Sequence, residues 1–196
     1  LILNSGGPVE LTDILEETEN ICAVLNISQL GQRGGLALAN VLLGKVTPGG
    51  KLTATWARRY EDYPCAEEYS YLNGKLEREE YKEGIYTGYR YFDTFGVKPL
   101  FPFGYGLSYT TFTLTGMKAW RDEENLYASV IAKNTGKREG SEVVQMYVGA
   151  ADSKVERPEY VLKDFQKIRL DAGEEKEVKK GSLEILYEDE NVIFIN

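Results

Sequence analysis

The stretch YKEGIYTGYRYFDTFGVKPLFPFGYGLSYTTF (residues 81–112) decides how the rest of the chain is interpreted. It holds eleven of the chain's twenty-three aromatic side chains. Glycines recur between the rings, so the backbone can bend tightly while large flat side chains are buried; they are Gly84, Gly88, Gly96, Gly104 and Gly106. A stretch with this many rings rarely lies free in water.

Two interpretations of this stretch compete. In the first, the rings clamp two domains together, because each buried aromatic side chain removes about 150–250 Å² of surface from water. In the second, some rings are platforms on which sugars stack, while nearby carboxylates and amides bind the sugar hydroxyls. The position of the stretch favours the clamp, and the ring content alone does not separate the two.

Length and composition limit the classes of protein. A chain of 196 residues with 42% hydrophobic content can form one large or two small domains. The net charge of −8 argues against a nucleic-acid partner, since phosphate binding requires clustered Lys and Arg. No apolar run approaches the ~18 residues of a membrane-spanning helix, so we expect no membrane partner.

The cysteines and the start of the sequence bear on the compartment. Two cysteines, Cys22 and Cys65, are too few for a disulfide framework, and Cys22 in the run ICAVL is expected to be buried. A reducing compartment, the cytoplasm, is favoured. Because the sequence opens inside an apolar strand, we expect its natural start to lie upstream, so the missing signal peptide says little.

Histidine is absent from the sequence, which removes several mechanisms at once. The chain cannot by itself build a Ser-His-Asp or Cys-His nucleophile, a His-ligated zinc site or a histidine acid-base. It has neither a phosphate-binding Gly-Lys-Ser/Thr signature nor a full dinucleotide fingerprint. We therefore expect no metal and no cofactor.

The first 57 residues show alternating strand and helix patterns. LILNSGG predicts a short strand, Thr12 or Asp13 can cap a brief helix that runs through Glu16 and Glu17, and residues 21–27 form an apolar run typical of a strand covered on both faces. Residues 34–43 predict a second helix, closed by a glycine. This order predicts a parallel sheet with helices on its faces.

The glycine-rich turn before the second helix is a candidate binding site. Turns at the carboxyl ends of parallel strands are where such sheets bind ligands. Gln32 and Arg33 occupy this turn and could contact a substrate or a neighbouring domain. Alternatively, Arg33 only covers the start of the helix, which is an unfavourable place for a cation.

Residues 45–56 predict a turn and an edge strand, and periodicity then disappears between residues 58 and 83. A connection longer than about 12–15 residues is usually functional or disordered. Its carboxylates are better interpreted as a solvated face than as a catalytic pair, which needs opposed placement; they are Glu67, Glu68, Glu77, Glu79, Glu80 and Glu83.

From about residue 109 onward the pattern is that of half-buried antiparallel strands. Apolar and polar residues alternate in five segments, 110–116, 125–136, 140–150, 159–170 and 174–185, with turns at residues 134–136 and 171–173. Five to seven strands in under ninety residues fit an immunoglobulin-like or fibronectin-like β-sandwich.

Six blocks of the sequence together resemble the C-terminal part of family 3 glycoside hydrolases, the β-glucosidase group. They are LNSGGPVEL (3–11), GQRGGLALANVLLGKVTPGGKLTATW (31–56), EGIYTGYRYFD (83–93), PLFPFGYGLSYTTF (99–112), AKNTGKREGSEVVQMYV (132–148) and RPEYVLKDFQKIRLDAGEEKEV (157–178). The blocks follow one another in order over almost the whole chain, which makes the resemblance specific.

The resemblance implies an α/β plus all-β fold. Residues 1–57 would be the C-terminal part of an α/β sandwich domain, residues 58–108 a linking segment with the aromatic clamp, and residues 109–196 an antiparallel fibronectin type III-like domain that lacks its usual last strand. Such a truncation would leave an unpaired edge or an incomplete core.

The resemblance also implies retaining hydrolysis of β-glucosides by an Asp nucleophile and a Glu acid-base. Neither maps onto this chain, because in the family the nucleophile lies on a separate barrel and the acid-base lies upstream of the first matching block. The implied partners are that N-terminal barrel and a small carbohydrate, and a second copy of the chain is left open. Tyr69 and Tyr71 are candidates to border the cleft.

Two departures from the family weaken a role for the turn before the second helix. The family commonly has Glu where this chain has Arg33, and an aromatic residue where it has Ser28-Gln29-Leu30. Three hypotheses remain: a non-catalytic C-terminal portion of a β-glucosidase-type hydrolase, a free-standing carbohydrate-binding module, and a structural interaction domain whose exposed apolar patch is covered by another domain.

Overall fold

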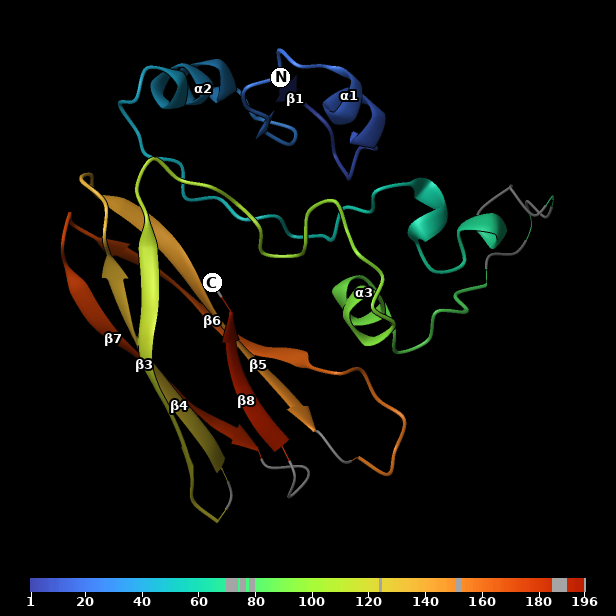
Figure 1. Ribbon diagram of the computed structural model, residues 1–196, viewed down its shortest axis with the longest axis vertical. Helices are drawn as coiled ribbons and strands as arrows, with labels where there is room; N and C mark the ends of the chain where they lie inside the picture. The colour runs from blue at the N-terminus through green and yellow to red at the C-terminus, as the bar shows by residue number, and fades with distance from the viewer. Residues whose placement is uncertain are drawn as a thin grey trace. The chain divides into compact units, whose positions relative to one another are not determined.

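The computed structural model describes residues 1–69, 74, 77, 80–123, 125–150, 153–184 and 190–195, and from residue 180 onward it describes only the backbone. The chain folds into two compact units (Figure 1). Leu1–Leu42 and Leu52–Tyr105 form the first, and Leu43–Lys51 and Gly106–Asn196 form the second. The boundaries expected from the sequence, 1–57, 58–108 and 109–196, stay a prediction.

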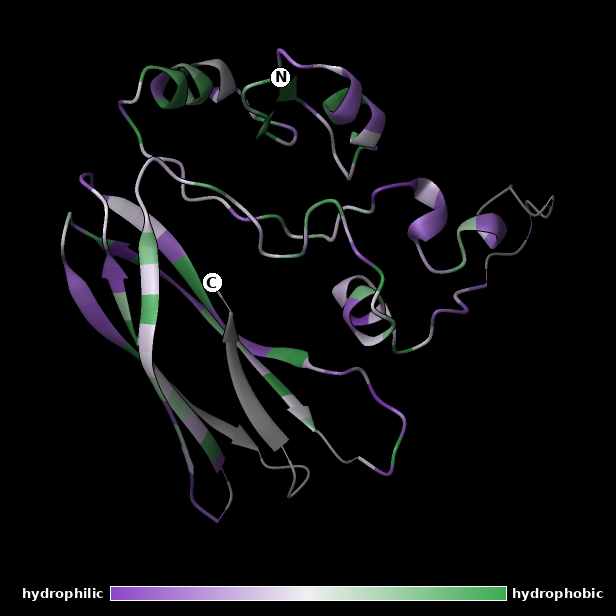
Figure 2. Cartoon of the chain, viewed as in Figure 1, coloured by the Kyte–Doolittle hydropathy of each residue, from purple (hydrophilic) through white to green (hydrophobic). Residues whose placement is uncertain are grey.

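The first unit begins with the predicted order of strand, helix, strand and helix. Strands β1 (Ile2–Leu3) and β2 (Leu25–Asn26) pair in parallel, and they alternate with helices α1 (Thr12–Glu17) and α2 (Gly34–Leu42). Helix α2 is hydrophobic over most of its length (Figure 2). No helix in the described part of the chain is long and apolar enough to cross a membrane.

The expected strand over residues 21–27 is wrong in length and in burial. Only Leu25 and Asn26 are in a strand, and Cys22, which we expected to be buried, is exposed. The described sheet has two strands, β1 and β2, each of two residues. A sheet of this size cannot cover a seven-residue apolar run on both faces.

The predicted capping of α1 is also wrong. The residue at the N-cap is Leu11, and no side chain caps the helix. Thr12 instead donates its hydroxyl hydrogen to the carbonyl oxygen of Arg58, 46 residues away. A capping side chain would accept a hydrogen bond from a backbone N–H group in the first turn of the helix. The Thr12 hydroxyl instead makes its bond to a distant part of the chain.

The expected edge strand over residues 45–56 is reduced to a backbone ladder. Residues 52–56 pair with residues 100–105 through hydrogen bonds of 2.8 Å from Leu52 N to Tyr105 O and from Trp56 N to Phe101 O. Helix α3 (Tyr89–Thr94) lies between these segments in the sequence and was not predicted. It begins after Gly88, whose φ of 56° is a conformation that favours glycine.

Rings of the aromatic stretch pack against one another and against two earlier rings in the first unit. Only Phe92 of the stretch is fully buried there, whereas Tyr81 and Phe95 are 76% and 56% exposed. Ring centroids lie 6.3 Å apart in the pair Trp56–Phe101, 5.8 Å in Tyr63–Phe92 and 5.1 Å in both Tyr89–Phe103 and Phe101–Tyr105. Most of these pairs are edge-to-face or tilted, the arrangements that the ring quadrupole favours. Packing of rings therefore replaces regular secondary structure over much of residues 52–105.

The second unit is the predicted antiparallel β-sandwich. Its two three-stranded sheets have the orders β3-β4-β7 and β6-β5-β8 (Figure 1). The strands are β3 (Phe112–Arg121), β4 (Asn125–Asn134), β5 (Gly140–Ala150), β6 (Val161–Leu170), β7 (Glu175–Glu184) and β8 (Glu190–Ile195). Strand β8 was not predicted, and it gives β5 a partner on its second side.

The sandwich core contains Val130, Ala132, Val144, Ile168, Leu170 and Val178. Beside it lies Asn134, which is completely buried and which the sequence indicated only as a turn residue. Its side-chain oxygen accepts hydrogen bonds from the Thr110 hydroxyl (2.6 Å) and the Gly136 N–H (3.1 Å). Its amide nitrogen donates to the carbonyl oxygens of Arg138 (2.7 Å) and Leu170 (3.1 Å).

The short segment 43–51 packs on the sandwich although it follows α2 in the sequence. The Lys51 ammonium lies 2.8 Å from the Glu142 carboxylate of β5, and the two side chains are only 13% and 6% exposed. Lys51 also donates to the carbonyl oxygen of Gly106 at 2.8 Å. Ser108 donates to the carbonyl oxygen of Pro48, also at 2.8 Å.

The Lys51→Met variant tests the buried ion pair. It leaves Glu142 as an uncompensated buried charge, so we expect the free energy of unfolding of the sandwich to fall by about 3–5 kcal/mol. Hydrogen exchange of the β4 and β5 amides measures this. As a control, Lys133→Met breaks an exposed pair with Glu175, whose side chains are 45% and 61% exposed, and should cost at most about 1 kcal/mol. Equal losses in the two variants would contradict this account.

The Asn134→Ala variant tests the buried amide. It leaves the Leu170 carbonyl and the Thr110 hydroxyl without their partner, so we expect a loss of at least about 2 kcal/mol. Urea unfolding followed through the methyl signals of Val130 and Val144 measures the loss. The exposed neighbour Thr135 serves as the control, because Thr135→Ala should change stability by no more than about 0.5 kcal/mol. A shift of the same size in both variants would show that the buried hydrogen bonds are not the cause.

Candidate functional site

Two loops lie at the carboxyl ends of the parallel strands, where ligand sites of α/β sheets occur. One follows β1 and the other follows β2 and includes Gln32 and Arg33. They come together at Gly6, where a Cβ atom would lie 3.3 Å from the side-chain amide of Gln29. Gln32 and Arg33 are both exposed in the turn that starts α2. Gln29 was not predicted as the residue that joins the loops.

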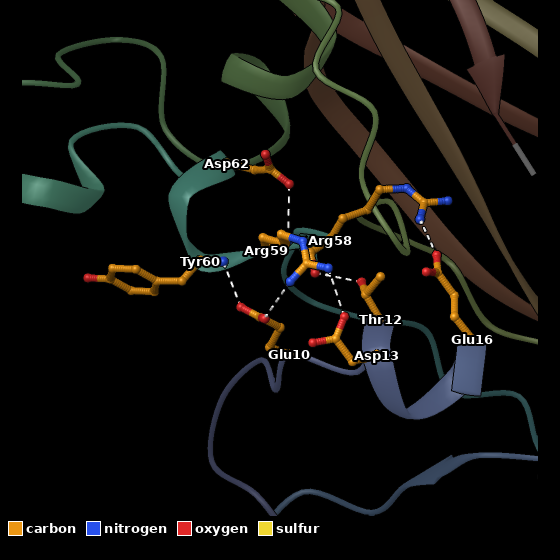
Figure 3. Close-up of polar contacts among 8 residues, drawn as sticks. All are labelled: Glu10, Thr12, Asp13, Glu16, Arg58, Arg59, Tyr60 and Asp62. Carbon is orange, nitrogen blue, oxygen red and sulfur yellow. Dashed lines mark hydrogen bonds and ion pairs between the residues drawn. The ribbon is translucent and has the colours of Figure 1, made fainter. Parts of the chain in front are cut away.

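A network of charged side chains fixes the loop that follows residue 57 to helix α1 (Figure 3). Arg59 donates to Asp13 at 2.7 Å, and the Tyr60 N–H donates to the Glu10 carboxylate at 2.8 Å. Arg58 lies 3.4 Å from Glu16. We call this network the α1 latch; its residues are Glu10, Thr12, Asp13, Glu16, Arg58, Arg59, Tyr60 and Asp62.

Within the α1 latch, the Asp13 carboxylate stabilises the charged form of Arg59. The hydrogen bond to Asp13, followed by the negative charge of Asp13, raises the pKa of Arg59 above its ordinary value. The Asp62 carboxylate accepts the backbone N–H of Arg59 at 3.0 Å, which starts the short 3₁₀ helix Tyr60–Asp62. Because the side chains of its ion pairs are exposed, these pairs orient the loop more than they add stability.

Tyr69 is placed in this loop directly after the 3₁₀ helix Ala66–Glu68, and its side chain is 57% exposed. Tyr71, the second cleft candidate, lies outside the described residues. Glu68 is held by Lys82 at 2.7 Å, and this hydrogen bond raises the pKa of Lys82. Among the described residues, no group of three or more carboxylates, cysteines or histidines is placed to hold a metal ion.

A hollow of about 380 Å³ in the first unit was not predicted from the sequence. Three rings and three threonines line it: Tyr63, Tyr89, Phe103, Thr53, Thr55 and Thr87. Tyr63 is held in place, since its hydroxyl donates to the Thr55 carbonyl at 3.2 Å and accepts the Ala57 N–H at 3.1 Å. The Thr55 hydroxyl is buried without a hydrogen-bond partner.

The lining of the hollow combines aromatic rings with hydroxyl-bearing side chains. Aromatic faces and hydroxyls suit a small neutral molecule with both apolar and hydroxyl-bearing surfaces. The residues that line it carry no carboxylate, histidine or cysteine. The sequence contained one signal for the hollow, because two of its rings, Tyr89 and Phe103, come from the aromatic stretch. That Thr53 and Thr55 lie beside these rings could not be predicted, because it depends on the pairing of residues 52–56 with residues 100–105.

Comparison with known proteins agrees with this architecture. Residues 1–109 match the model of the glycosyl hydrolase family 3 C-terminal domain, and residues 142–180 match that of a fibronectin type III-like domain. An α/β part followed by such a sandwich defines the class, the C-terminal region of a multidomain glycoside hydrolase. The chain belongs to glycosyl hydrolase family 3.

The relatives are β-glucosidases. The chain is 45% identical to thermostable β-glucosidase B of Acetivibrio thermocellus and 44% identical to β-glucosidase BoGH3A of Bacteroides ovatus, in each case over 91% of this chain and 23% or 24% of the relative. β-Glucosidase 3B from Thermotoga neapolitana, solved in complex with glucose, matches with a TM-score of 0.85 and 40% identity over 92% of this chain and 25% of that one. The chain thus spans about a quarter of these relatives.

The Arg59→Gln variant tests the α1 latch. Without the guanidinium, the loop loses its hydrogen bond to Asp13 and the ion pair of Arg59 with Glu10 at 3.8 Å, so we expect chymotrypsin to cleave after Tyr60 several-fold faster. Arg169→Gln is the matched control, because it makes the same substitution at an arginine that forms an exposed ion pair with Glu139 in the sandwich. Unchanged cleavage in Arg59→Gln, or the same acceleration in both variants, would show that the latch does not hold the loop.

Proposed function

We propose that the chain is the C-terminal portion of a retaining β-glucosidase-type glycoside hydrolase, which hydrolyses O-glycosyl bonds of β-glucosides. The observation that carries this proposal is the match of 91% of this chain to about a quarter of two β-glucosidases at 44–45% identity. In this proposal, residues 1–57 complete an α/β domain, residues 58–108 form the linking segment, and residues 109–196 are the fibronectin type III-like domain.

In the proposed enzyme, both catalytic carboxylates lie outside this chain. Retaining hydrolysis needs a nucleophile and an acid-base about 5–5.5 Å apart on opposite sides of the glycosidic bond. The carboxylates that the structure brings together in the first unit are bound to cations instead, as Asp13 is to Arg59 and Glu68 is to Lys82. In the proposed enzyme these ion-paired carboxylates hold the chain in position and take no part in bond cleavage.

The proposed partner is the N-terminal barrel of the same enzyme together with the rest of its α/β domain. Apolar side chains that a complete α/β domain would cover are exposed in the first unit: Leu36 is 56% exposed, Leu42 is 54% exposed and Ile2 is 45% exposed. Covering such side chains is favourable, at roughly 25 cal/mol per Å² of apolar surface. A second copy of the chain is the alternative cover.

The proposed role of the loop 58–83 is to border the leaving-group side of the cleft. The α1 latch gives this loop a defined starting position, and Tyr69 presents an exposed ring beyond it. Tyr71, Gln32 and Arg33 are the further proposed contacts with the substrate or with the neighbouring domain. The substrate is a small carbohydrate with a β-linked glucosyl unit.

A second candidate function is a carbohydrate-binding module without catalysis. The hollow favours it, since three rings and three threonines line a space of about 380 Å³. Binding of glucose that is lost in Tyr89→Ala, with no turnover in any combination of chains, would favour the module over the hydrolase portion.

Turnover of an aryl β-glucoside tests the proposed function. We expect none from the chain alone and activity on coexpression with the N-terminal part of a family 3 β-glucosidase. The Phe92→Asp variant places a charge at a ring that is only 1% exposed and should disrupt the first unit. Coexpression of this variant with the N-terminal part should give no activity. Hydrolysis by the chain alone that is abolished by Glu80→Gln would contradict the proposal.

A further inference from the structure

A pair of parallel aromatic rings lies on the outer face of the sandwich. Trp120 of β3 and Tyr127 of β4 are opposite each other in the strand register. Their ring centroids are 5.8 Å apart and their planes differ by only 9°. Ala128, the neighbour of Tyr127, is fully buried, and side chains alternate along a strand, so the two rings face away from the core.

The Tyr127 ring is held in place by Asp122, the residue that follows β3. The Tyr127 hydroxyl donates to one carboxylate oxygen of Asp122 at 2.8 Å. The other oxygen accepts the Asn125 N–H at 2.7 Å, and the Asp122 N–H donates to the Asn125 carbonyl at 3.1 Å. The Asp122 carboxylate thus stands at the hydroxyl edge of the Tyr127 ring and is itself held by Asn125.

A purely structural role explains only part of this arrangement. Cross-strand aromatic pairs stabilise a hairpin by about 0.2–1 kcal/mol. Trp120, however, keeps 46% of its surface exposed, whereas the other tryptophan, Trp56, is 3% exposed. An exposed indole held parallel to a second ring presents a flat face to solvent.

The charges around the rings select the kind of ligand. Lys118 lies on the same face, two residues before Trp120, and its charge contributes to the lowered pKa of Glu177. Asp122 and the net charge of −8 disfavour an anionic ligand on the ring faces, and Lys118 opposes the attraction that they exert on a cationic one. A neutral ligand with one apolar face and a rim of hydroxyls remains, which is the chemistry of a sugar ring.

We propose that Trp120 and Tyr127 form a platform that binds neutral oligosaccharide chains, with the sugar C–H faces on the rings and Asp122 accepting a sugar hydroxyl at the edge. Ring faces are electron-rich, so they attract the weakly positive C–H groups of a sugar. A carboxylate oxygen can accept more than one hydrogen bond, so Asp122 can accept a sugar hydroxyl in addition to the bonds that it makes in the chain. This binding involves no turnover and therefore goes beyond the proposed hydrolase function.

Calorimetric titration of the whole chain with cellotetraose tests the platform. We expect saturable binding in the parent chain and a Kd at least about tenfold weaker in Trp120→Thr, which corresponds to ~1.4 kcal/mol. Threonine keeps the strand propensity, so this variant should fold, and circular dichroism verifies that. Tyr127→Phe keeps the ring and releases Asp122, and it should weaken binding by less than Trp120→Thr does.

Phe165→Thr is the matched control. This ring is 62% exposed on β6 of the other sheet and stands without a parallel partner ring among the described residues, so its removal should leave the Kd unchanged. No saturable heat with cellotetraose, or equal binding in Trp120→Thr and the parent, would overturn the platform. Binding that survives Trp120→Thr but is lost in Tyr89→Ala would overturn it too, because the sugar would then occupy the hollow of the first unit.

Discussion

The buried ion pair between Lys51 and Glu142 sets the strictest constraint on this molecule. Two charges removed from water are tolerated only when their geometry is good and their remaining hydrogen bonds are made. Here Lys51 is bound by both the Glu142 carboxylate and the Gly106 carbonyl, each at 2.8 Å. The segment 43–51 is therefore part of the sandwich, although its sequence continues directly from helix α2.

The first unit is held by different forces. Its two parallel strands are only two residues long, and most of the described residues between 52 and 105 lie outside helices and strands. The buried rings Trp56 and Phe92 pack edge to face with neighbouring rings, and the α1 latch fixes the loop after residue 57 through exposed charges. A unit built in this way presents loops in defined positions, which suits a scaffold at the border of a binding cleft.

Elements with a clear local periodicity could be predicted from the sequence. Alternation in residues 125–136 and 140–150 indicated β4 and β5, and the apolar pattern of residues 34–43 indicated α2. Features that depend on distant partners were missed: the sequence indicates Asn134 only as a turn residue, because Thr110 and Leu170, which bind it, lie far away along the chain. Of the candidate site residues, Gln32, Arg33 and Tyr69 are exposed, whereas the ring-lined hollow depends on pairing between distant segments.

Two neighbouring glycines offer the most direct measurement of whether segment 43–51 closes the sandwich. A Cβ atom at Gly49 would lie 2.9 Å from the Ser141 carbonyl oxygen, whereas one at Gly50 would meet nothing within 4 Å. We expect Gly49→Ala to lower the urea midpoint of the sandwich and Gly50→Ala to keep it or raise it, because alanine restricts the unfolded chain. Equal midpoints for the two variants would contradict the account.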